Sequence, residues 1–346
     1  ASEGPLNVRA LVVTNMYPTA AVPYAGAFVA AQVESVRAAG VDVDVFHLAR
    51  PEHGRNVYRG LGERVKERVS ELEPDLVHVM YGGVMADAVN RAVRDRPVVV
   101  SFCGTDLLGG RADGIVARLA VRYSARASRR AARRAAGIVV KSRNLYAALP
   151  REVDRSRVWI VPNGVDVSRF RPLDRDECRR RLGWSVDRRH VLFPAPPARP
   201  EKRFELAEAS VALLNGGSPA PELHALEGVP HEDVPTWLNA ANVVVLTSAH
   251  EGSPNAVKEA LACNVPVVSV DVGDVRERIE GIEGCFLAAP TAEDLADKLE
   301  RAITRSEPIA GRERMAELSL ERVAARLLGI YGSLANGAAD AKLSRG

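Results

Sequence analysis

Short runs of β-branched and other apolar residues alternate with Ala-, Arg- and Glu-rich stretches along the whole chain. Such alternation is typical of β–α units, in which a helix carries the chain from one strand to the next, parallel strand. The apolar runs contain few polar residues, which predicts parallel sheets buried on both faces. With 346 residues, the chain is long enough to form two such sheets, each with its own core.

The apolar runs fall into two series. The first predicts strands at residues 9–14, 41–48, 75–80, 97–102, 137–142 and 157–162, and the second at 190–195, 222–228, 242–248, 265–270 and 285–288. The boundary falls in 165–187, a segment with Pro, Gly and charge but little apolar periodicity. We therefore predict an α/β fold with two doubly wound, Rossmann-like domains, residues 1–165 and 166–318, facing a cleft.

The last periodic segment, residues 319–335, predicts an amphipathic helix that no strand follows. We expect this helix to pack back on the first domain and residues 336–346 to form a frayed tail.

Composition narrows the class of protein. Apolar residues make up 47% and charged residues 26%, and the net charge of +3 does not by itself indicate a nucleic-acid partner. The sequence shows neither an apolar window of spanning length nor the regions of a signal peptide at its start. Four cysteines without CxxC spacing fit neither a zinc site nor a disulfide framework, so we expect a cytoplasmic protein.

The stretch HEGSPNAVKEALACNVPVVS, residues 250–269, places two carboxylates around a predicted helix start. Ser253 and Pro254 form a good N-cap and first-turn pair, and the amides of the following turn are suited to phosphate oxygens. Glu251 precedes the turn, and the side chain of Glu259 leans back toward the same place. The alternative is that Glu259 is a solvated helix residue and Glu251 interacts only with the helix dipole.

At this point the sequence resembles a family, the retaining GT-B glycosyltransferases of family four. The likeness rests on EGSPNAVKEALACNVPVVSVDVG and on four further segments in the family's order: NMYPTAAVPYAGAFVAAQVESVRAAGVDVDVF, VVVSFCGTDL, IVPNGVDVSRFRP and RPEKRFELAEA. It spans almost the whole chain.

The resemblance implies metal-independent, retaining transfer of a sugar from a nucleotide diphosphate, with UDP preferred, to an acceptor hydroxyl. The C-terminal domain would hold the donor and the N-terminal domain the acceptor, in polysaccharide, glycolipid or antibiotic biosynthesis. By this resemblance Glu251 contacts sugar hydroxyls, Glu259 binds the ribose diol, Lys202 neutralises the β-phosphate and Gly26 lets the backbone approach the donor. The turn that holds the diphosphate would be formed by Gly252, Ser253, Pro254, Asn255 and Ala256.

The sequence also departs from the family's pattern. Five residues before Lys202, where the family places an Arg, stands Pro197, so Arg199 is assigned to that role with an exposed loop arginine as the alternative. Cys103 replaces a frequent His, and Asp106 is expected on the acceptor side or in a structural role. Further acceptor-side candidates, for which loop packing is an alternative explanation, are Asn15, Tyr17, Tyr81 and Gly82.

Other functions of the same fold stay open. They are a non-catalytic nucleotide-sugar-binding protein, a UDP-sugar epimerase, and a phosphorylase relative, for which no pyridoxal phosphate site is evident.

Two remaining patterns bear on partners. In RLAVRYSARASRRAARRAAG, the arginines from Arg118 to Arg134 fall within an arc of about 160° on a helix. They predict a solvated basic face or, alternatively, a surface for anionic lipid or an acidic acceptor at the inner face of a membrane. The pair Asp42 and Asp44 lies inside a predicted strand, and none of the seven histidines has metal-ligand spacing, so no metal or cofactor is expected.

Overall fold

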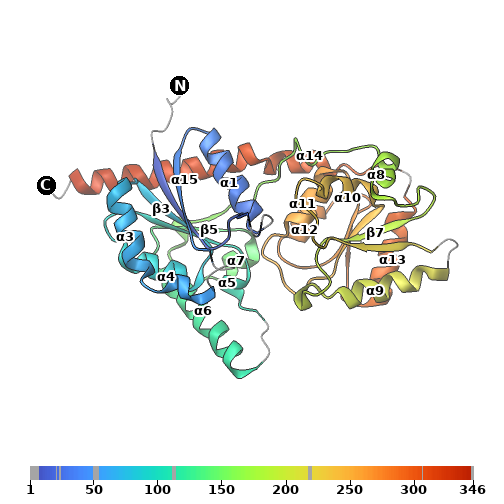
Figure 1. Ribbon diagram of the computed structural model, residues 1–346, viewed down its shortest axis with the longest axis horizontal. Coiled ribbons are helices and arrows are strands. Elements are labelled where there is room, and N and C mark those ends of the chain that lie inside the picture. The colour runs from blue at the N-terminus through green and yellow to red at the C-terminus, as the bar shows by residue number, and fades with distance from the viewer. Residues whose placement is uncertain are drawn as a thin grey trace. The chain divides into compact units, whose positions relative to one another are not determined.

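The computed structural model describes residues 8–20, 22, 25–49, 54–110, 114–216, 220–305 and 307–343 (Figure 1). The chain divides into two compact units. Unit 1 comprises residues 1–164 and 320–346, and unit 2 comprises residues 165–319. Each unit is a parallel sheet with helices on both of its faces.

In unit 1 six parallel strands lie in the order β2-β1-β3-β4-β5-β6. The strands are β1 (Arg9–Thr14), β2 (Asp42–His47), β3 (Leu76–Met80), β4 (Val98–Phe102), β5 (Gly137–Val140) and β6 (Val158–Ile160). The helices are α1 (Ala27–Ala38), α3 (Leu61–Leu72), α4 (Gly83–Ala92), α5 (Thr105–Leu108), α6 (Ile115–Arg134), α7 (Arg143–Ala148) and α15 (Leu320–Leu343).

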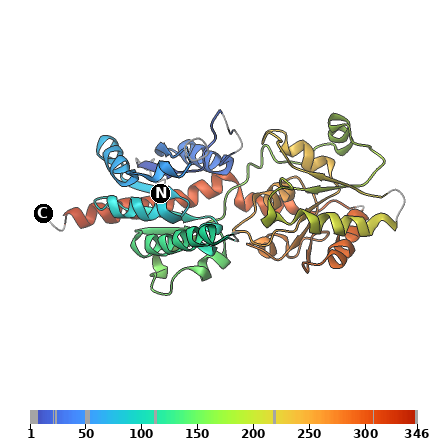
Figure 2. The same cartoon turned by 60° about the horizontal axis from the view of Figure 1, so that its bottom comes forward.

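The sheet of unit 1 is buried on both faces because successive side chains of a strand point to opposite sides. Leu11 and Val13 of β1 join the core formed with α3, α4 and α6. Ala10 and Val12 join the core formed with α1 and α15. The C-terminal helix α15 therefore completes one face of the sheet built by the start of the chain, and it lies beside α1 (Figures 1 and 2).

In unit 2 five parallel strands lie in the order β11-β10-β9-β7-β8. They are β7 (His190–Phe193), β8 (Glu222–Ala225), β9 (Val243–Leu246), β10 (Val267–Val270) and β11 (Phe286–Ala288). One face is covered by α10 (Val234–Ala240), α11 (Asn255–Ala262), α12 (Val275–Ile279) and α14 (Gly311–Met315), and the other by α9 (Phe204–Ala212) and α13 (Ala292–Ile303). Helix α8 (Arg175–Leu182) packs against α10.

The predicted doubly wound α/β fold is confirmed, and each of the eleven predicted strands contains an observed one. A frayed tail was predicted from residue 336 onward. This was wrong for residues 336–343, because α15 continues to Leu343. Asn264 has a φ of 55°, a left-handed conformation that Asn tolerates, and its Oδ1 accepts a hydrogen bond from the Arg312 amide at 2.8 Å.

A buried hydrogen-bonded chain fastens α15 to the sheet. The hydroxyl of Tyr331 lies 2.6 Å from His78 Nδ1, and His78 Nε2 lies 2.8 Å from the hydroxyl of Ser101. Burial, with a smaller contribution from Lys141, lowers the pKa of His78 to about 3. The ring therefore stays neutral in the folded state at pH values at which it becomes charged in the unfolded chain.

This chain generates a test of stability. We expect Tyr331→Phe to lower the free energy of unfolding by about 1–3 kcal/mol, because His78 Nδ1 loses its partner in a buried place. Urea denaturation at pH 7 measures the change. Tyr123→Phe is the control, since the side chain of Tyr123 is 56% exposed and its change should stay within about 0.5 kcal/mol.

The same histidine gives the stability of the parent chain a pH dependence. Below about pH 6.5 the unfolded state binds a proton at His78 that the folded state does not, so this contribution falls as the pH drops from 6.5 toward 3. A Tyr331→Phe chain as stable as the parent at pH 7 would contradict the role of the buried chain.

Candidate functional site

The sheet of unit 2 brings two loops together. Strand β7 lies directly beside β9, and because both strands are parallel their C-terminal ends open at the same edge. The loop after β7 contains a 3-10 turn, Pro200–Lys202, and the loop after β9 leads into α11. Residues far apart in sequence thus meet at this edge.

Several hydrogen bonds tie the two loops to each other. The hydroxyl of Thr247 contacts the carbonyl oxygens of Lys202 and Arg203 at 2.7 and 2.9 Å. Arg203 donates to the carbonyls of Thr247 and Ser248 at 2.5 and 3.1 Å, and the Ala249 amide donates to the Glu201 carbonyl at 2.8 Å. The backbone on both sides is therefore fixed before any ligand binds.

An ion pair of Lys202 and Glu251 lies at the centre of this arrangement. Lys202 Nζ is 2.5 Å from Glu251 Oε1, and the two side chains are only 15% and 16% exposed. A charge-assisted hydrogen bond in such a shielded place is stronger than a pair on the open surface. The structure thus brings together the cation and the carboxylate that the sequence predicted for one site.

The turn between Glu251 and α11 is built differently from the prediction. Helix α11 begins at Asn255 with Pro254 as its N-cap, and no side chain caps it, so the predicted N-cap role of Ser253 was wrong. The hydroxyl of Ser253 instead donates to Asp274 Oδ2 at 2.9 Å and accepts from Lys258 Nζ at 3.1 Å. Both partners are buried, so they hold the loop from beneath.

The first turn of α11 includes Asn255 and Ala256, as the sequence predicted. In any α-helix the amides of this turn have no acceptor within the helix, and the positive end of the helix dipole lies here. This end of α11 follows the loop that carries Glu251 and is therefore suited to an anion.

Glu259 lies in the second turn of α11 and has a partner that the sequence did not indicate. His231 Nε2 is 3.3 Å from Glu259 Oε1, and His231 Nδ1 is 3.3 Å from Arg169 Nη1. Both contacts come from loops remote in sequence, so no local spacing pattern could have revealed them.

The two arginines near Lys202 differ in their surroundings. Arg199 contacts Glu201 at 2.5 Å and its side chain is 53% exposed. Arg203 reaches the backbone after β9 instead, as described above. The sequence drew attention to Arg199 and missed Arg203, although Arg203 is adjacent to Lys202 in the chain.

In unit 1 the candidate residues after β1 lie close to the start of α1. Gly26 has a φ of 70°, and a Cβ atom at this position would collide with the backbone of Met16 and Tyr17. Asn15 Nδ2 donates to the Tyr58 hydroxyl at 2.8 Å, and the ring of Tyr17 lies 6.0 Å from that of His47. Glycine is therefore required at residue 26 for the close approach of these two segments.

The candidates after β3 and β4 are connected through Asp106. Its buried carboxylate accepts hydrogen bonds from the amides of Gly82 at 2.8 Å, Cys103 at 3.1 Å and Gly104 at 2.7 Å. Burial raises the pKa of Asp106, and these amides partly offset the rise. These contacts show that Asp106 joins the loops after β3 and β4. The hydroxyls of Tyr81 and Thr105 lie 2.7 Å apart at the same edge.

The basic helix α6 has two different halves. Arg130 and Arg134 bind the buried carboxylate of Asp87 at 2.8 and 2.9 Å, so they are not part of a purely solvated face. The N-terminal half instead exposes a group of apolar side chains, which are Ile115, Val116, Leu119 and Tyr123. Within the described part of the chain, no helix has both the length and the hydrophobicity needed to cross a bilayer.

The potential metal ligands lie on strands and not in the loops that carry Lys202 and Glu251. Asp42 and Asp44 are bound to Arg9 and Arg68 at 2.7 and 2.8 Å. Among the described residues, one group of His, Cys, Asp or Glu side chains converges closely enough to hold a metal ion, and it consists of His190, Glu222 and His224. These residues lie at the start of β7 and on β8.

The chain is similar to known glycosyltransferases over both units. The Glycosyltransferase Family 4 model matches residues 25–169, and the Glycosyl transferases group 1 model matches residues 201–305. The putative teichuronic acid biosynthesis glycosyltransferase TuaC of Bacillus subtilis is 28% identical over 85% of this chain and 89% of its own.

Solved structures share the fold. Sucrose-phosphate synthase from Thermosynechococcus elongatus superposes with a TM-score of 0.78 at 19% identity, covering 95% of this chain and 99% of its own. Anabaena HepE in complex with UDP superposes with a TM-score of 0.66 at 16% identity, covering 94% of this chain and 100% of its own.

The loop that carries Glu251 lies so close to Gly273 that it leaves no room for a side chain there, and this can be tested. This glycine has a φ of 61°, and a Cβ atom would lie 2.8 Å from the Gly252 carbonyl oxygen and 3.2 Å from Glu251 Cβ. We expect Gly273→Ala to lower the free energy of unfolding by more than about 2 kcal/mol, through the left-handed conformation and the clash together.

Gly183→Ala is the matched control for this prediction. Gly183 has a φ of 70° but open space where its Cβ would lie, so only the conformational cost of about 1–2 kcal/mol applies. Urea denaturation of both variants gives the difference, and equal losses would show that the loop tolerates the extra carbon.

Proposed function

The chain belongs to the group 1 glycosyltransferases of family 4 and has their GT-B fold, and from its site we propose a retaining transferase that uses a nucleotide diphosphate sugar. We infer UDP as the nucleotide, since HepE, which shares the fold, was solved with UDP and with UDP-glucose. The acceptor is a hydroxyl group, in the biosynthesis of a polysaccharide, a glycolipid or an antibiotic.

The observation that carries this proposal is the contact of Lys202 with Glu251 beside the start of α11. A diphosphate has negative charge that an ammonium group and a helix N-terminus both stabilise. A sugar attached to that diphosphate presents hydroxyls that a carboxylate accepts. The 2.5 Å contact between Lys202 Nζ and Glu251 Oε1 supports the proposal that the bond between sugar and phosphate lies near both groups.

Each residue then has a distinct role toward the donor. Lys202 exchanges part of its contact with Glu251 for the β-phosphate, and Glu251 turns to the sugar hydroxyls. The turn from Gly252 to Ala256 holds the diphosphate, and Glu259 takes the ribose diol while His231 orients its carboxylate. Arg199 has to leave Glu201 to reach the diphosphate, which its half-exposed side chain permits.

The transfer breaks the bond between the anomeric carbon and the phosphate oxygen and forms a bond to the acceptor oxygen on the same face. The acceptor's proton goes to the departing phosphate oxygen, so no protein acid is consumed. Charge develops on the diphosphate as the bond breaks, and preorganised donors there lower the barrier. Lys202 and the end of α11 supply this positive field, and we propose that the transfer step needs no metal ion.

The acceptor side is assigned to unit 1. We propose that Asn15, Tyr17, Tyr81, Gly82 and Cys103 contribute to it, with Asp106 acting as a positioning residue for Gly82 and Cys103. Gly26, in the same unit, lets the backbone approach the donor. Two of the three other functions kept from the sequence, nucleotide-sugar binding without transfer and epimerisation, would use the same donor contacts. They differ from transfer in what becomes of the donor.

Substitutions at the ion pair test the donor site. We expect Lys202→Ala and Glu251→Gln each to lower kcat by about a hundredfold or more, because each removes a group that stabilises the transition state. The donor is first selected by thermal shift with UDP- and GDP-sugars, since a ligand that binds the folded state raises its Tm. Glu283→Gln is the control, because Glu283 is an 86% exposed carboxylate of the same unit.

The products separate the proposal from its alternatives. Release of UDP with slow hydrolysis of the donor in the absence of acceptor supports a transferase. A changed sugar on an intact donor identifies an epimerase, and binding without any turnover identifies a binding protein. Unchanged turnover in both variants would refute the site assignment.

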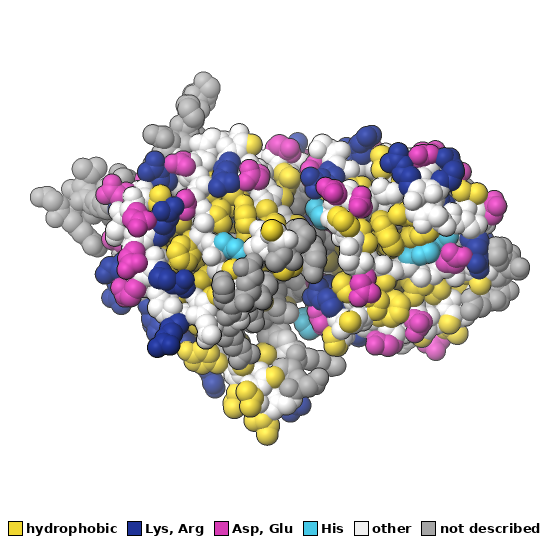
Figure 3. Space-filling model, in the orientation of Figure 1, with side chains coloured by type: hydrophobic (Ala, Val, Ile, Leu, Met, Phe, Trp, Pro, Cys, Tyr) yellow, Lys and Arg dark blue, Asp and Glu magenta, His cyan; other side chains and the backbone are white. Residues whose placement is uncertain are grey.

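We further propose that α6 brings the enzyme to an anionic membrane surface, so that the acceptor is lipid-linked. Ile115, Val116 and Tyr123 are 76%, 78% and 56% exposed, and with Leu119 they fall within an arc of about 100° on the helix. Arg118 and Arg122 follow the edge of this arc. Figure 3 shows hydrophobic side chains gathered at the tip of the region that α6 forms in Figure 1. An apolar stripe bordered by basic residues is typical of helices that lie in the lipid headgroup region.

Vesicle binding tests this surface. We expect the Ile115→Ser, Leu119→Ser double variant to lose about tenfold or more in affinity for phosphatidylglycerol vesicles in a sedimentation assay. Leu213→Ser is the control, since Leu213 is an exposed apolar residue of unit 2. Equal binding by the parent, the double variant and the control would exclude this role of α6.

A further inference from the structure

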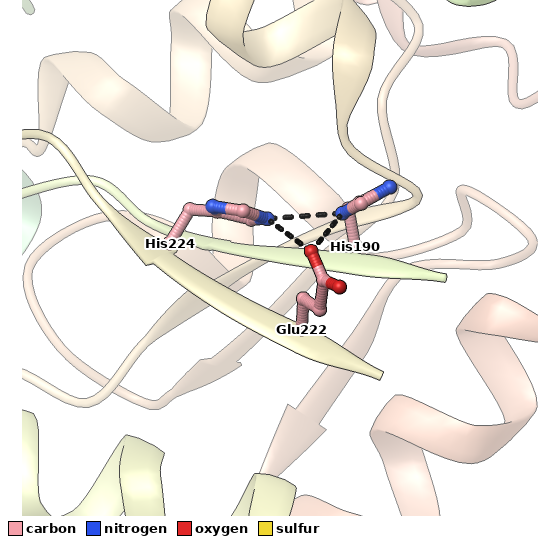
Figure 4. A group of neighbouring side chains, drawn as sticks. All are labelled: His190, Glu222 and His224. Atoms are coloured by element: carbon pink, nitrogen blue, oxygen red, sulfur yellow. Dashed lines mark hydrogen bonds and ion pairs between the residues drawn. The ribbon is translucent and has the colours of Figure 1, made fainter. Parts of the chain in front are cut away.

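Three side chains at the edge of the unit 2 sheet converge on one point. His190 is the first residue of β7, and Glu222 and His224 lie two residues apart on the edge strand β8. The strand register pairs His190 with Glu222 and Leu192 with His224. Residues two apart on a strand share a face, so the register places all three side chains on the same side of the sheet. Figure 4 shows them pointing toward one another.

The separations of the three ligand atoms match the spacing that a small cation requires. His190 Nδ1 and His224 Nε2 are 2.9 Å apart, and Glu222 Oε2 lies 3.6 Å from the first and 3.7 Å from the second. The point that lies in the plane of these three atoms and is equidistant from them is about 2.0 Å from each, which is the usual length of zinc bonds to imidazole nitrogen and carboxylate oxygen.

The surroundings orient each ligand toward this point. His190 Nε2 lies 2.7 Å from the Ser185 carbonyl oxygen, a contact that requires the proton on Nε2 and leaves the Nδ1 lone pair facing the cluster. The ring of His224 stacks on Trp184 with centroids 3.6 Å apart. Arg188 binds Glu222 Oε1 at 2.5 Å, so the other carboxylate oxygen, Oε2, is the one that faces the histidines.

The cluster is buried on one side and reaches solvent on the other. His190 is fully buried, whereas Glu222 and His224 keep part of their surface in contact with solvent, which leaves access for the ion and for a water as fourth ligand.

We propose that His190, Glu222 and His224 form a binding site for one zinc ion. Two imidazoles and one carboxylate with an open fourth position form a ligand set that zinc accepts, whereas magnesium and calcium prefer all-oxygen sites. The site is distinct from the proposed donor site. It lies where β7 and β8 begin, while Lys202 and Glu251 follow the ends of β7 and β9.

The position indicates what the ion does. Edge strand β8 is hydrogen-bonded to β7 alone in this sheet, and the cluster also contacts the segment after α8 through Ser185 and Trp184. An ion bound by residues of both strands would link the edge strand β8 to β7 near the N-terminal ends of the two strands. Because the ligands converge only in the folded state, binding stabilises that state and raises the Tm.

Zinc titration of the chelator-treated full chain tests the site. We expect one zinc ion per chain by elemental analysis after dialysis, a raised Tm, and visible absorption typical of four-coordinate cobalt when Co²⁺ replaces Zn²⁺. Glu222→Gln and His224→Gln should each weaken zinc binding at least tenfold and abolish the zinc-dependent rise in Tm.

Glu300→Gln is the matched control, since Glu300 also pairs with a single neighbouring arginine, Arg189, but lies outside the cluster. It should bind zinc like the parent. Zinc binding that both cluster variants retain would place the ion elsewhere, for instance on cysteines, and would overturn the proposal. A parent chain that neither takes up zinc nor gains stability from it would also overturn the proposal, because the hydrogen bond between the two histidines would then explain why they lie together.

Discussion

The parallel order of strands in each sheet is the constraint on which the proposed chemistry depends. Parallel neighbours end at the same edge, so the loops that follow them must meet, whatever their distance in the sequence. In unit 2 this rule brings Lys202, after β7, against Glu251, after β9, although they lie 49 positions apart in the sequence. No additional interaction is needed for this placement, because the hydrogen bonds between the core strands also fix the points at which both loops begin.

Polar groups beneath the loops then set the positions of the functional side chains. Thr247 and Arg203 join the loops after β7 and β9. Asp274 holds Ser253, and the absence of a side chain at Gly273 lets the next loop approach Gly252. In unit 1 the carboxylate of Asp106 has a similar role, because it gathers amides from the loops after β3 and β4. Buried polar groups that are satisfied in this way give a site one defined geometry.

The two ends of the unit 2 strands thus have different chemistry. At their C-terminal ends, a cation, two carboxylates and a helix N-terminus suit an anionic sugar donor. At the start of β7 and on β8, two imidazoles and a carboxylate are grouped as a divalent cation would require. Short buried strands lie between the two ends, and their packing keeps both sets of side chains in place. Stability and transfer can therefore be studied by separate substitutions.

Much of the fold followed from the sequence, because a strand buried on both faces must be apolar throughout, and that pattern needs no partner to be recognised. The same holds for the pairing of Glu251 with a following helix, since both are local to one segment. The interactions that position them were not predictable in this way. Ser253 was predicted to cap α11, yet its hydroxyl binds Asp274, which lies 21 residues later in the chain, beyond β10.

The sequence by itself therefore determined the strands and their two series, and its resemblance to a family supplied the residues that we propose for binding a diphosphate sugar. Only the tertiary structure decided which side chains touch. It joined Lys202 to Glu251, His231 to Glu259, and His190 to Glu222 and His224. The physical reason is that secondary structure depends on neighbouring residues, whereas these contacts depend on strand order and register, which pair residues that are distant in the chain.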